Sequence, residues 1–258
     1  MDNLPVNAIS TGVRLGLFND IRAAQQDPTV KAVVIAGSDT AFAAGADIRE
    51  FGGDPTQPVG MIDIRQLIQA GDLPIVAAIN GVALGGGLEL AMYADYRVAD
   101  AHAMLGMPEL KLGIVPGGGG TQHLPRLVGA EKALAILLSS KPLDAMTALQ
   151  VGLIDEVTES NVVDAACAMA QQIVDGNLPR VDIRQLDDKI DQDRGKTEIF
   201  VKARTQAKRS LASQRAPVKA IEAVEAAVAG DYDAGIAFER AANRECLADP
   251  QRAAMVHL

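Results

Sequence analysis

The stretch ALGGGLELAMY (residues 83–93) places three consecutive glycines directly before a run of helix-forming residues. It continues PIVAAINGVAL (74–84), a short apolar run with the turn signal Asn80-Gly81, so a buried strand is expected before the glycines. The glycines then fall at a strand-to-helix junction, where main-chain amides point outward from the helix N-terminus. The helix that follows carries one acid, Glu89, in otherwise apolar surroundings, and this acid needs an explanation.

Strands and helices alternate around this stretch. Apolar spacing and capping residues predict helices over 11–28 and 161–176, a buried strand over 30–39, and a helix followed by a short strand within 144–157. A second glycine run, PGGGGT (116–121), precedes a helix expected to begin near Gln122. Two glycine-rich helix openings are more than turn chemistry requires.

The character of the sequence changes near residue 180. RVDIRQLDDKIDQDRGKTE (180–198) is highly charged and irregular, which indicates a connector. Helices are then predicted over 217–230, with Val218, Ile221, Val224 and Val228 on one face, and over 233–247. We therefore predict an α/β core with the active site over 1–180, and a charged connector with a C-terminal helical region over 181–258.

Composition narrows the partners and the compartment. The 33 acidic and 24 basic residues give a net charge of -9, and Trp is absent, so a nucleic-acid partner is not expected. The apolar runs are far shorter than the roughly 20 residues needed to cross a bilayer. Without a visible signal peptide or a membrane span, a cytoplasmic location is the default expectation. Cys167 and Cys246 are expected to be reduced.

A second acid in similar surroundings favours a chemical role for Glu89. A glycine triplet alone is more often a packing or turn feature, and a lone Glu more often lies at the solvent edge of its helix. Glu109, however, stands in GMPELKLGIVPGGGG (106–120), again among apolar residues and glycines. Two such carboxylates, with pKa values raised by burial, suit acid–base chemistry on a shared water. FAAGADI (42–48) adds small residues around Gly45, whose amides would form an oxyanion hole with the glycine triplet if the two loops meet.

Other chemistries are not supported by spacing. His102, His123 and His257 have no metal-ligand spacing with one another or with the cysteines, so no metal site is predicted. GGGGT lacks the lysine of a P-loop, and GGGLEL does not match the dinucleotide-binding pattern of glycines. Bound ATP or NAD is therefore not expected.

Five segments, in order and at matching spacing, resemble the crotonase superfamily. They are PVNAIS (5–10), FAAGADI (42–48), NGVALGGGLELAMYADYRVA (80–99), PELKLGIVPGGGGTQHLPRLVG (108–129) and GLIDEV (152–157). The resemblance extends from about residue 5 to the C-terminus. It is closest to the hydratase/isomerase half of bifunctional fatty-acid oxidation enzymes, because of GIVPGGGGTQHLPRLVG (113–129), the connector and APVKAIEAVEAAV (216–228). It implies an α/β fold, a crotonase-like spiral of ββα units with a C-terminal helical region.

The resemblance also implies an activity and a set of site residues. The expected reaction is hydration of trans-2-enoyl-CoA to 3-hydroxyacyl-CoA in fatty-acid β-oxidation, with Δ3,Δ2-enoyl-CoA isomerase activity as an addition. CoA is part of the substrate, and no separate cofactor is implied. The implied residues are the catalytic acids Glu89 and Glu109, the oxyanion amides of Ala46 and Gly86, and the substrate-binding residues Ala44, Asp47, Ile48 and Gly117, with Arg49 in reach of a CoA phosphate.

Several alternatives stay open at this point. Another CoA-thioester reaction could use the same oxyanion site, and a truncated, non-catalytic CoA-ester-binding or RNA-binding paralogue is a third possibility. Relatives carry a longer segment before Pro5, and the bifunctional ones continue beyond a point like DPQRAAMVHL (249–258). A fragment, a trimmed chain and a short paralogue are the expectations left open. A homo-oligomer, trimer or hexamer, is expected unless the chain is one domain of a bifunctional enzyme. Acyl chain length depends on the variable stretch 49–72 and is not predicted.

Overall fold

A computed structural model describes residues 1–3, 5–38, 40–50, 58–211 and 214–256. The chain forms two compact units: unit 1 comprises residues 1–105 and 143–183, and unit 2 comprises residues 106–142 and 184–258. This grouping differs from the predicted division at residue 180, because residues 106–142 have most of their contacts with the C-terminal helices. Each unit is described by itself.

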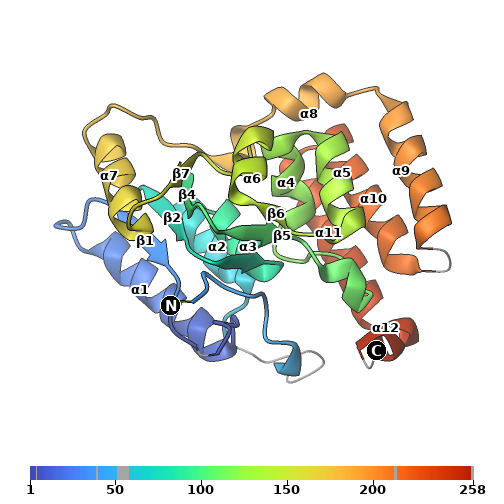
Figure 1. Cartoon of the computed structure of the whole chain (residues 1–258), viewed down its shortest axis with the longest axis horizontal. Helices are drawn as coiled ribbons and strands as arrows, with labels where there is room; N and C mark the ends of the chain where they lie inside the picture. Colours follow the sequence, from blue (N-terminus) through green and yellow to red (C-terminus); the bar gives the residue numbers. More distant parts are fainter. Residues whose placement is uncertain (4, 39, 51–57, 212–213, 257–258) are drawn as a thin grey trace. The chain divides into compact units, whose positions relative to one another are not determined.

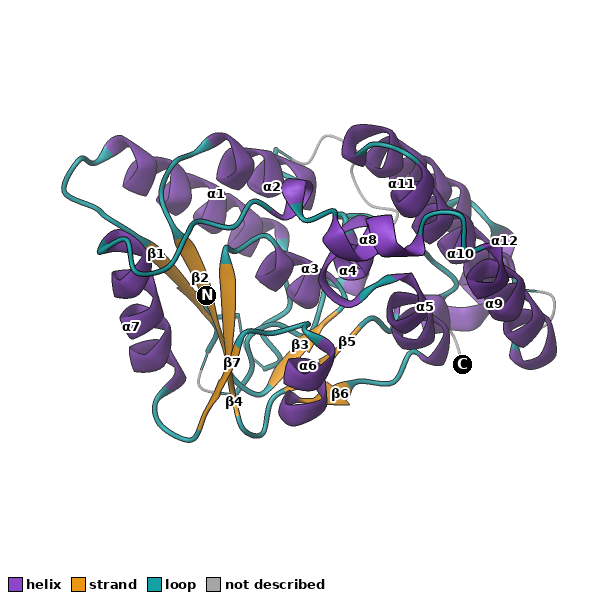
Figure 2. Ribbon diagram, turned by 90° about the horizontal axis from the view of Figure 1, so that it is seen from above, coloured by secondary structure: helices purple, strands orange, loops and turns teal. Residues whose placement is uncertain are grey.

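A four-stranded parallel sheet forms the centre of unit 1 (Figure 1). Its strands, in spatial order, are β1 (Val33–Ala36), β2 (Ile75–Ile79), β4 (Tyr96–Asp100) and β7 (Glu156–Thr158). Every residue of β2 is buried, as expected for a central parallel strand covered on both faces. One face packs against α7 (Val162–Val174), where Val76 and Val98 contact the helix through a buried cluster that includes Met169 (Figure 2).

The described chain forms a second, three-stranded sheet, and its strands follow a strand–strand–helix order along the sequence. Its order is β3 (Val82–Leu84), β5 (Met104–Gly106) and β6 (Leu143–Asp144). The chain passes from β2 to β3 through the predicted Asn80-Gly81 turn, in which Gly81 has a φ of 58°. Helix α3 (Gly86–Met92) follows β3, and the next two strands along the chain are β4 in the first sheet and β5 in the second. These strand–strand–helix steps are the ββα units predicted from the sequence.

Capping residues in the sequence explain where the other helices of unit 1 begin and end. Ser10 caps α1 (Thr11–Gln26), Gly60 precedes α2 (Met61–Ala70), and Asp144 caps α6 (Ala145–Val151), which ends at the left-handed Gly152. The α1 helix packs against α2. Within the described residues, no helix is long and apolar enough to cross a membrane.

Unit 2 is built of helices. They are α4 (Gly120–Val128), α5 (Ala130–Ser139), α8 (Asp188–Asp193), α9 (Thr197–Ser210), α10 (Arg215–Ala229), α11 (Tyr232–Leu247) and α12 (Pro250–Val256). Helix α10 contacts α4, α5, α9 and α11 and is the central helix of the unit. The predicted connector is not irregular throughout, because Ile190 is fully buried and the residues around it form α8. The described residues also form short 3₁₀ turns, which are η1 (Ile48–Glu50), η2 (Glu109–Leu112) and η3 (Ile183–Gln185).

The glycine triplet offers a direct test of packing. A Cβ atom at Gly87 would lie 2.2 Å from the carbonyl oxygen of Ala43, so Gly87→Ala should lower the free energy of unfolding by about 1–3 kcal/mol. Gly16 in α1 is the matched control, because its Cβ would meet nothing within 4 Å. Gly16→Ala should stabilise the protein by roughly 0.5–1 kcal/mol. Urea unfolding measures both changes, and equal midpoints for Gly87→Ala and the unmutated chain would contradict the close approach.

Candidate active site

The glycine triplet brings the start of α3 against the loop that contains Ala46. Gly85 precedes the helix with φ 51° and ψ −122°, a conformation available to glycine and unfavourable for other residues. A Cβ atom at Gly86 would lie 3.3 Å from the Ala46 amide nitrogen. The loop 42–48 and the glycine triplet therefore meet, which spacing along the sequence could not decide.

Two bridges fix the direction of the Ala46 amide. Ala43 pairs with Ala83 next to the glycine triplet, and Ala46 pairs with Ile9. In the second bridge the Ile9 N–H donates to the Gly45 carbonyl at 2.8 Å, and the Asp47 N–H donates to the Ile9 carbonyl at 3.4 Å. Since successive peptide groups of an extended chain point to opposite sides, the Ala46 N–H points away from Ile9. Among the described residues, no acceptor faces the N–H of Ala46 or that of Gly86.

Glu89 lies one helical turn after Gly86. The first α3 hydrogen bond runs from the Glu89 N–H to the Gly85 carbonyl at 2.9 Å, so the N–H of Gly86 precedes the ladder of the helix. Every residue of α3 is buried, and Glu89 is only 4% exposed. One rigid element thus holds a carboxylate and a free helix N-terminal amide in fixed relation.

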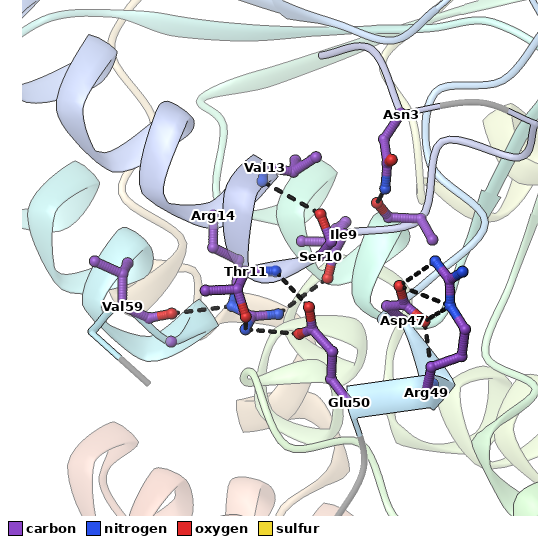
Figure 3. A network of polar contacts seen from close by, with 12 residues as sticks. Asn3, Ile9, Ser10, Thr11, Val13, Arg14, Asp47, Arg49, Glu50 and Val59 are labelled. Carbon is purple, nitrogen blue, oxygen red and sulfur yellow. Dashed lines mark hydrogen bonds and ion pairs between the residues drawn. The ribbon is translucent and has the colours of Figure 1, made fainter. Parts of the chain in front are cut away.

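The predicted substrate-binding loop is held by its own ion pair (Figure 3). The Arg49 guanidinium donates to both Asp47 carboxylate oxygens, with 2.6 Å from Nη2 to Oδ2 and 2.9 Å from Nε to Oδ1. These contacts hold the pKa of Asp47 below its ordinary value. The Arg49 side chain is 80% exposed, so its predicted approach to a CoA phosphate stays a prediction. Ala44 is half-buried, and the side chain of Ile48 lies outside the described residues.

A buried arginine, not identified from the sequence, ties this loop to α1 (Figure 3). Arg14 donates from Nε to the Val59 carbonyl at 2.9 Å, from Nη1 to the Ile9 carbonyl at 3.0 Å, and from Nη2 to Glu50 Oε2 at 2.9 Å. The other oxygen of Glu50 accepts from the Thr11 N–H at 2.8 Å, at the start of α1. The available signal was a basic residue at position 14, one turn before Leu17 on the apolar face of the helix.

Glu109 and Gly117 belong to unit 2. Glu109 opens the η2 turn and is 8% exposed, and the turn ends at Gly113 in the left-handed conformation. The Ile114 N–H donates to the Glu109 carbonyl at 3.2 Å, which fixes the exit of the turn. A Cβ atom at Gly117 would lie 2.8 Å from the side-chain amide of Asn243, so only glycine fits there without a shift of Asn243.

The second glycine run receives a carboxylate from within the chain. Glu239 on α11 is fully buried and accepts from the Gly119 N–H at 2.6 Å and from the Thr121 N–H at 2.7 Å. It also accepts from the Thr121 hydroxyl at 2.6 Å. The anion at this helix opening is therefore a side chain. Its signal in the sequence was the spacing of Glu239 from Ile236 and Cys246, which places it on the buried face of the predicted helix.

Comparison with known proteins identifies the class of protein that this fold and site define. The family model described as enoyl-CoA hydratase/isomerase matches residues 1–226, and the chain belongs to this family. A solved structure of an enoyl-CoA hydratase subunit I from Geobacillus kaustophilus shares 28% identity over 96% of this chain and 85% of its own, with a TM-score of 0.60. The family and the crotonase-like fold predicted from the sequence are thereby confirmed.

Curated relatives are longer proteins. The peroxisomal bifunctional enzyme of Danio rerio is 41% identical over 239 residues, which cover 93% of this chain and 33% of that protein. The glyoxysomal fatty acid beta-oxidation multifunctional protein MFP-a of Cucumis sativus is 38% identical over 243 residues, 91% of this chain and 34% of that protein. The chain therefore spans about a third of the length of these relatives.

The Glu50 contacts predict a pH-dependent contribution to stability. Burial raises the pKa of Glu50, but the Thr11 N–H and the Arg14 guanidinium outweigh it and hold the pKa below its ordinary value. The stabilisation is then present above the ordinary pKa and is lost as the pH falls through the lowered one. At about pH 7, Glu50→Gln should lower the free energy of unfolding by about 1–3 kcal/mol, and the difference should shrink toward about pH 3. Urea unfolding of both proteins measures it, with exposed Glu159→Gln as the control; a difference independent of pH would contradict this account.

Proposed function

We propose that the chain hydrates trans-2-enoyl-CoA thioesters to 3-hydroxyacyl-CoA in fatty-acid β-oxidation. The observation that carries this proposal is the meeting of the Ala46 amide and Gly86, with Glu89 one turn further along the same helix. Two main-chain N–H donors without an acceptor in the described chain suit a developing oxyanion. The family description supports the same reaction class, and the name of the Cucumis sativus relative supports a part in fatty-acid β-oxidation.

Each site residue then has a defined part in the reaction. The thioester oxygen accepts hydrogen bonds from the N–H groups of Ala46 and Gly86, which makes C3 of the enoyl group electrophilic. Glu89 takes a proton from a water molecule as the water oxygen attacks C3, and negative charge moves to the thioester oxygen. Glu109, protonated at the start, gives its proton to C2 as that charge returns. The proton taken up by Glu89 then returns to Glu109, which restores both carboxyl groups. The product has gained the hydroxyl group at C3 and one hydrogen at C2, so one water is consumed.

Magnitudes indicate which residues to test. Each oxyanion donor is typically worth about 3–4 kcal/mol of transition-state stabilisation, but a main-chain N–H is not removed by a side-chain substitution. General acid–base groups typically contribute about a hundredfold to ten-thousandfold in rate. Glu89 and Glu109 are therefore the accessible positions.

Substrate binding follows from the same assignment. We assign Ala44, Asp47 and Ile48 to the CoA moiety and Gly117 to the acyl and water side, as the resemblance implies. CoA is part of the substrate, and the proposed reaction needs no other cofactor and no metal. Binding of CoA to Asp47→Ala and the unmutated chain, measured by calorimetry, tests the first part of this assignment.

Assembly and location are further proposals. We keep the expected homo-oligomer, trimer or hexamer, for the chain by itself, and light scattering after gel filtration measures it. If the chain is one domain of a bifunctional enzyme, a monomer is expected. A cytoplasmic location stays the prediction from the sequence, whereas the relatives above are named as peroxisomal and glyoxysomal proteins.

The hydratase proposal is tested by the loss of enone absorbance from crotonyl-CoA and from a medium-chain enoyl-CoA. Glu89→Gln and Glu109→Gln should each lower kcat by about a hundredfold or more, with unchanged circular dichroism. Glu159→Gln, the same substitution at an exposed loop position, should keep the full rate. A near-normal rate in either variant would remove that residue from the mechanism. No rate from folded, CoA-binding protein would favour another CoA-thioester reaction or a non-catalytic role.

Isomerase activity is a second candidate, because the family description names it together with hydration. Moving a double bond from C3 to C2 takes a proton from C2 and returns one to C4, without adding water, so one carboxylate suffices. Glu89→Gln should therefore lose hydration while keeping much of the conversion of a 3-enoyl-CoA, and Glu109→Gln should lose both. The two rates are measured on the same preparations by chromatography of the CoA products. Equal losses in both variants would contradict this division of roles.

A further inference from the structure

Helix α11 carries a buried acid to which the proposed reaction gives no part. Glu239 accepts from the Gly119 N–H and from the N–H and the hydroxyl of Thr121, all in the second glycine-rich segment. A buried charge is costly unless donors compensate it, and donors aimed at an ionised oxygen form the stronger class of hydrogen bond. Glu239 is therefore strongly attached to the start of α4.

A second residue of α11, one turn later, contacts the other end of the segment that precedes α4. Asn243 donates from Nδ2 to the Val115 carbonyl at 2.5 Å. Its side chain occupies the space that a Cβ atom at Gly117 would need. Residues 239 and 243 are four positions apart and lie on one face of the helix. Helix α11 thus holds residues 115–121 at both ends.

The segment 115–121 follows closely after the η2 turn, which carries Glu109. Only Gly113 and Ile114 separate the η2 turn from Val115, and the Ile114 N–H is bonded to the Glu109 carbonyl. A Cβ atom at Gly113 would lie 3.3 Å from the Arg252 Cα in α12, so the turn is also packed from behind. A shift of residues 115–121 is therefore passed to Glu109 through a short and tightly packed connection.

We propose that Glu239 and Asn243 are positioning residues that hold Glu109 in its catalytic place through the segment 115–121. This rests on the proposed function, in which Glu109 delivers the proton to C2. Proton transfer requires a heavy-atom distance within hydrogen-bond reach, and a displacement of about 1 Å can cost about a hundredfold in rate. The α11 contacts therefore affect kcat without contributing any atom to the reaction.

Steady-state kinetics with crotonyl-CoA tests the proposal in the full chain. Glu239→Gln replaces one acceptor oxygen by a donor that faces N–H groups, and kcat should fall about tenfold to a hundredfold while KM changes less than about threefold. Glu245→Gln is the matched control: the same substitution on the exposed face of the same helix, expected to leave kcat unchanged. Asn243→Ala should act like Glu239→Gln with a smaller loss.

Two smaller substitutions at Thr121 distinguish a lost contact from a loss of folding. Thr121→Val keeps the shape of the side chain and removes the hydroxyl that donates to Glu239 and accepts from Gln122 Nε2. Thr121→Ser restores both contacts. We expect a loss of kcat in Thr121→Val and its recovery in Thr121→Ser, measured below the unfolding temperature of both. A loss that Thr121→Ser does not recover would overturn the role of this contact.

A double-mutant cycle separates positioning from a general loss of stability. If the contact acts through Glu109, Thr121→Val should cost little further rate in a Glu109→Gln background but its full factor in a Glu89→Gln background. Equal factors in both backgrounds, or unchanged kcat in Glu239→Gln and Thr121→Val, would overturn the inference while leaving the hydratase assignment intact. An unmutated chain without hydratase activity would overturn the proposed function and this inference together.

Discussion

The close approach of α3 to the segment 43–46 is the constraint on which the rest of unit 1 depends. The helix begins against this segment, and a side chain at Gly87 would overlap the Ala43 carbonyl while one at Gly86 would crowd the Ala46 amide. Next to this contact, the bridge between Ala43 and Ala83 joins β3 to the chain after β1. Close packing and the proposed oxyanion site therefore both require glycine at these positions. The packing explanation and the oxyanion explanation of these glycines do not compete, because the approach that excludes side chains also brings the two amides together.

Buried and half-buried acids have distinct roles, which their hydrogen-bond donors reveal. Asp95 accepts from the Ile75 N–H at the start of β2 and pairs with Arg180, so it anchors the chain that leaves unit 1 after α7. Glu50 joins α1 to the η1 turn, and Glu239 holds the start of α4. Each of these carboxylates accepts from a main-chain N–H at the beginning of a strand or helix, where the fold leaves such groups unsatisfied. A buried acid in this protein is thus a structural device at several places, and burial alone does not mark catalysis.

Apolar periodicity predicted the helices and strands, but not which of them are in contact. The helices near 11–26, 162–174 and 232–247 and the strands β1 and β2 follow from apolar spacing and capping residues. In α10, Ile221, Val224 and Val228 are buried as predicted. Val218 is exposed, and the small residues Ala216 and Ala220 extend the buried face. The contact of 42–48 with 85–87 depends on bridges to Ile9 and Ala83, which are tertiary pairings without a local pattern. The family resemblance supplied the roles of Glu89 and Glu109, which spacing alone left open.

The two glycine-rich helix openings show why local sequence does not decide which of them awaits a ligand. Both expose main-chain amides, and both begin buried helices. At α4 the facing helix brings the Glu239 carboxylate, so these donors are already satisfied. At α3 the facing segment brings the Ala46 N–H, a second donor, and the described chain offers neither donor an acceptor. Two neighbouring donors without an acceptor in the described chain suit an oxygen that carries negative charge. The element opposite each opening therefore decides whether its amides stay available, and of the two openings only the one at α3 keeps the donors that the proposed reaction needs.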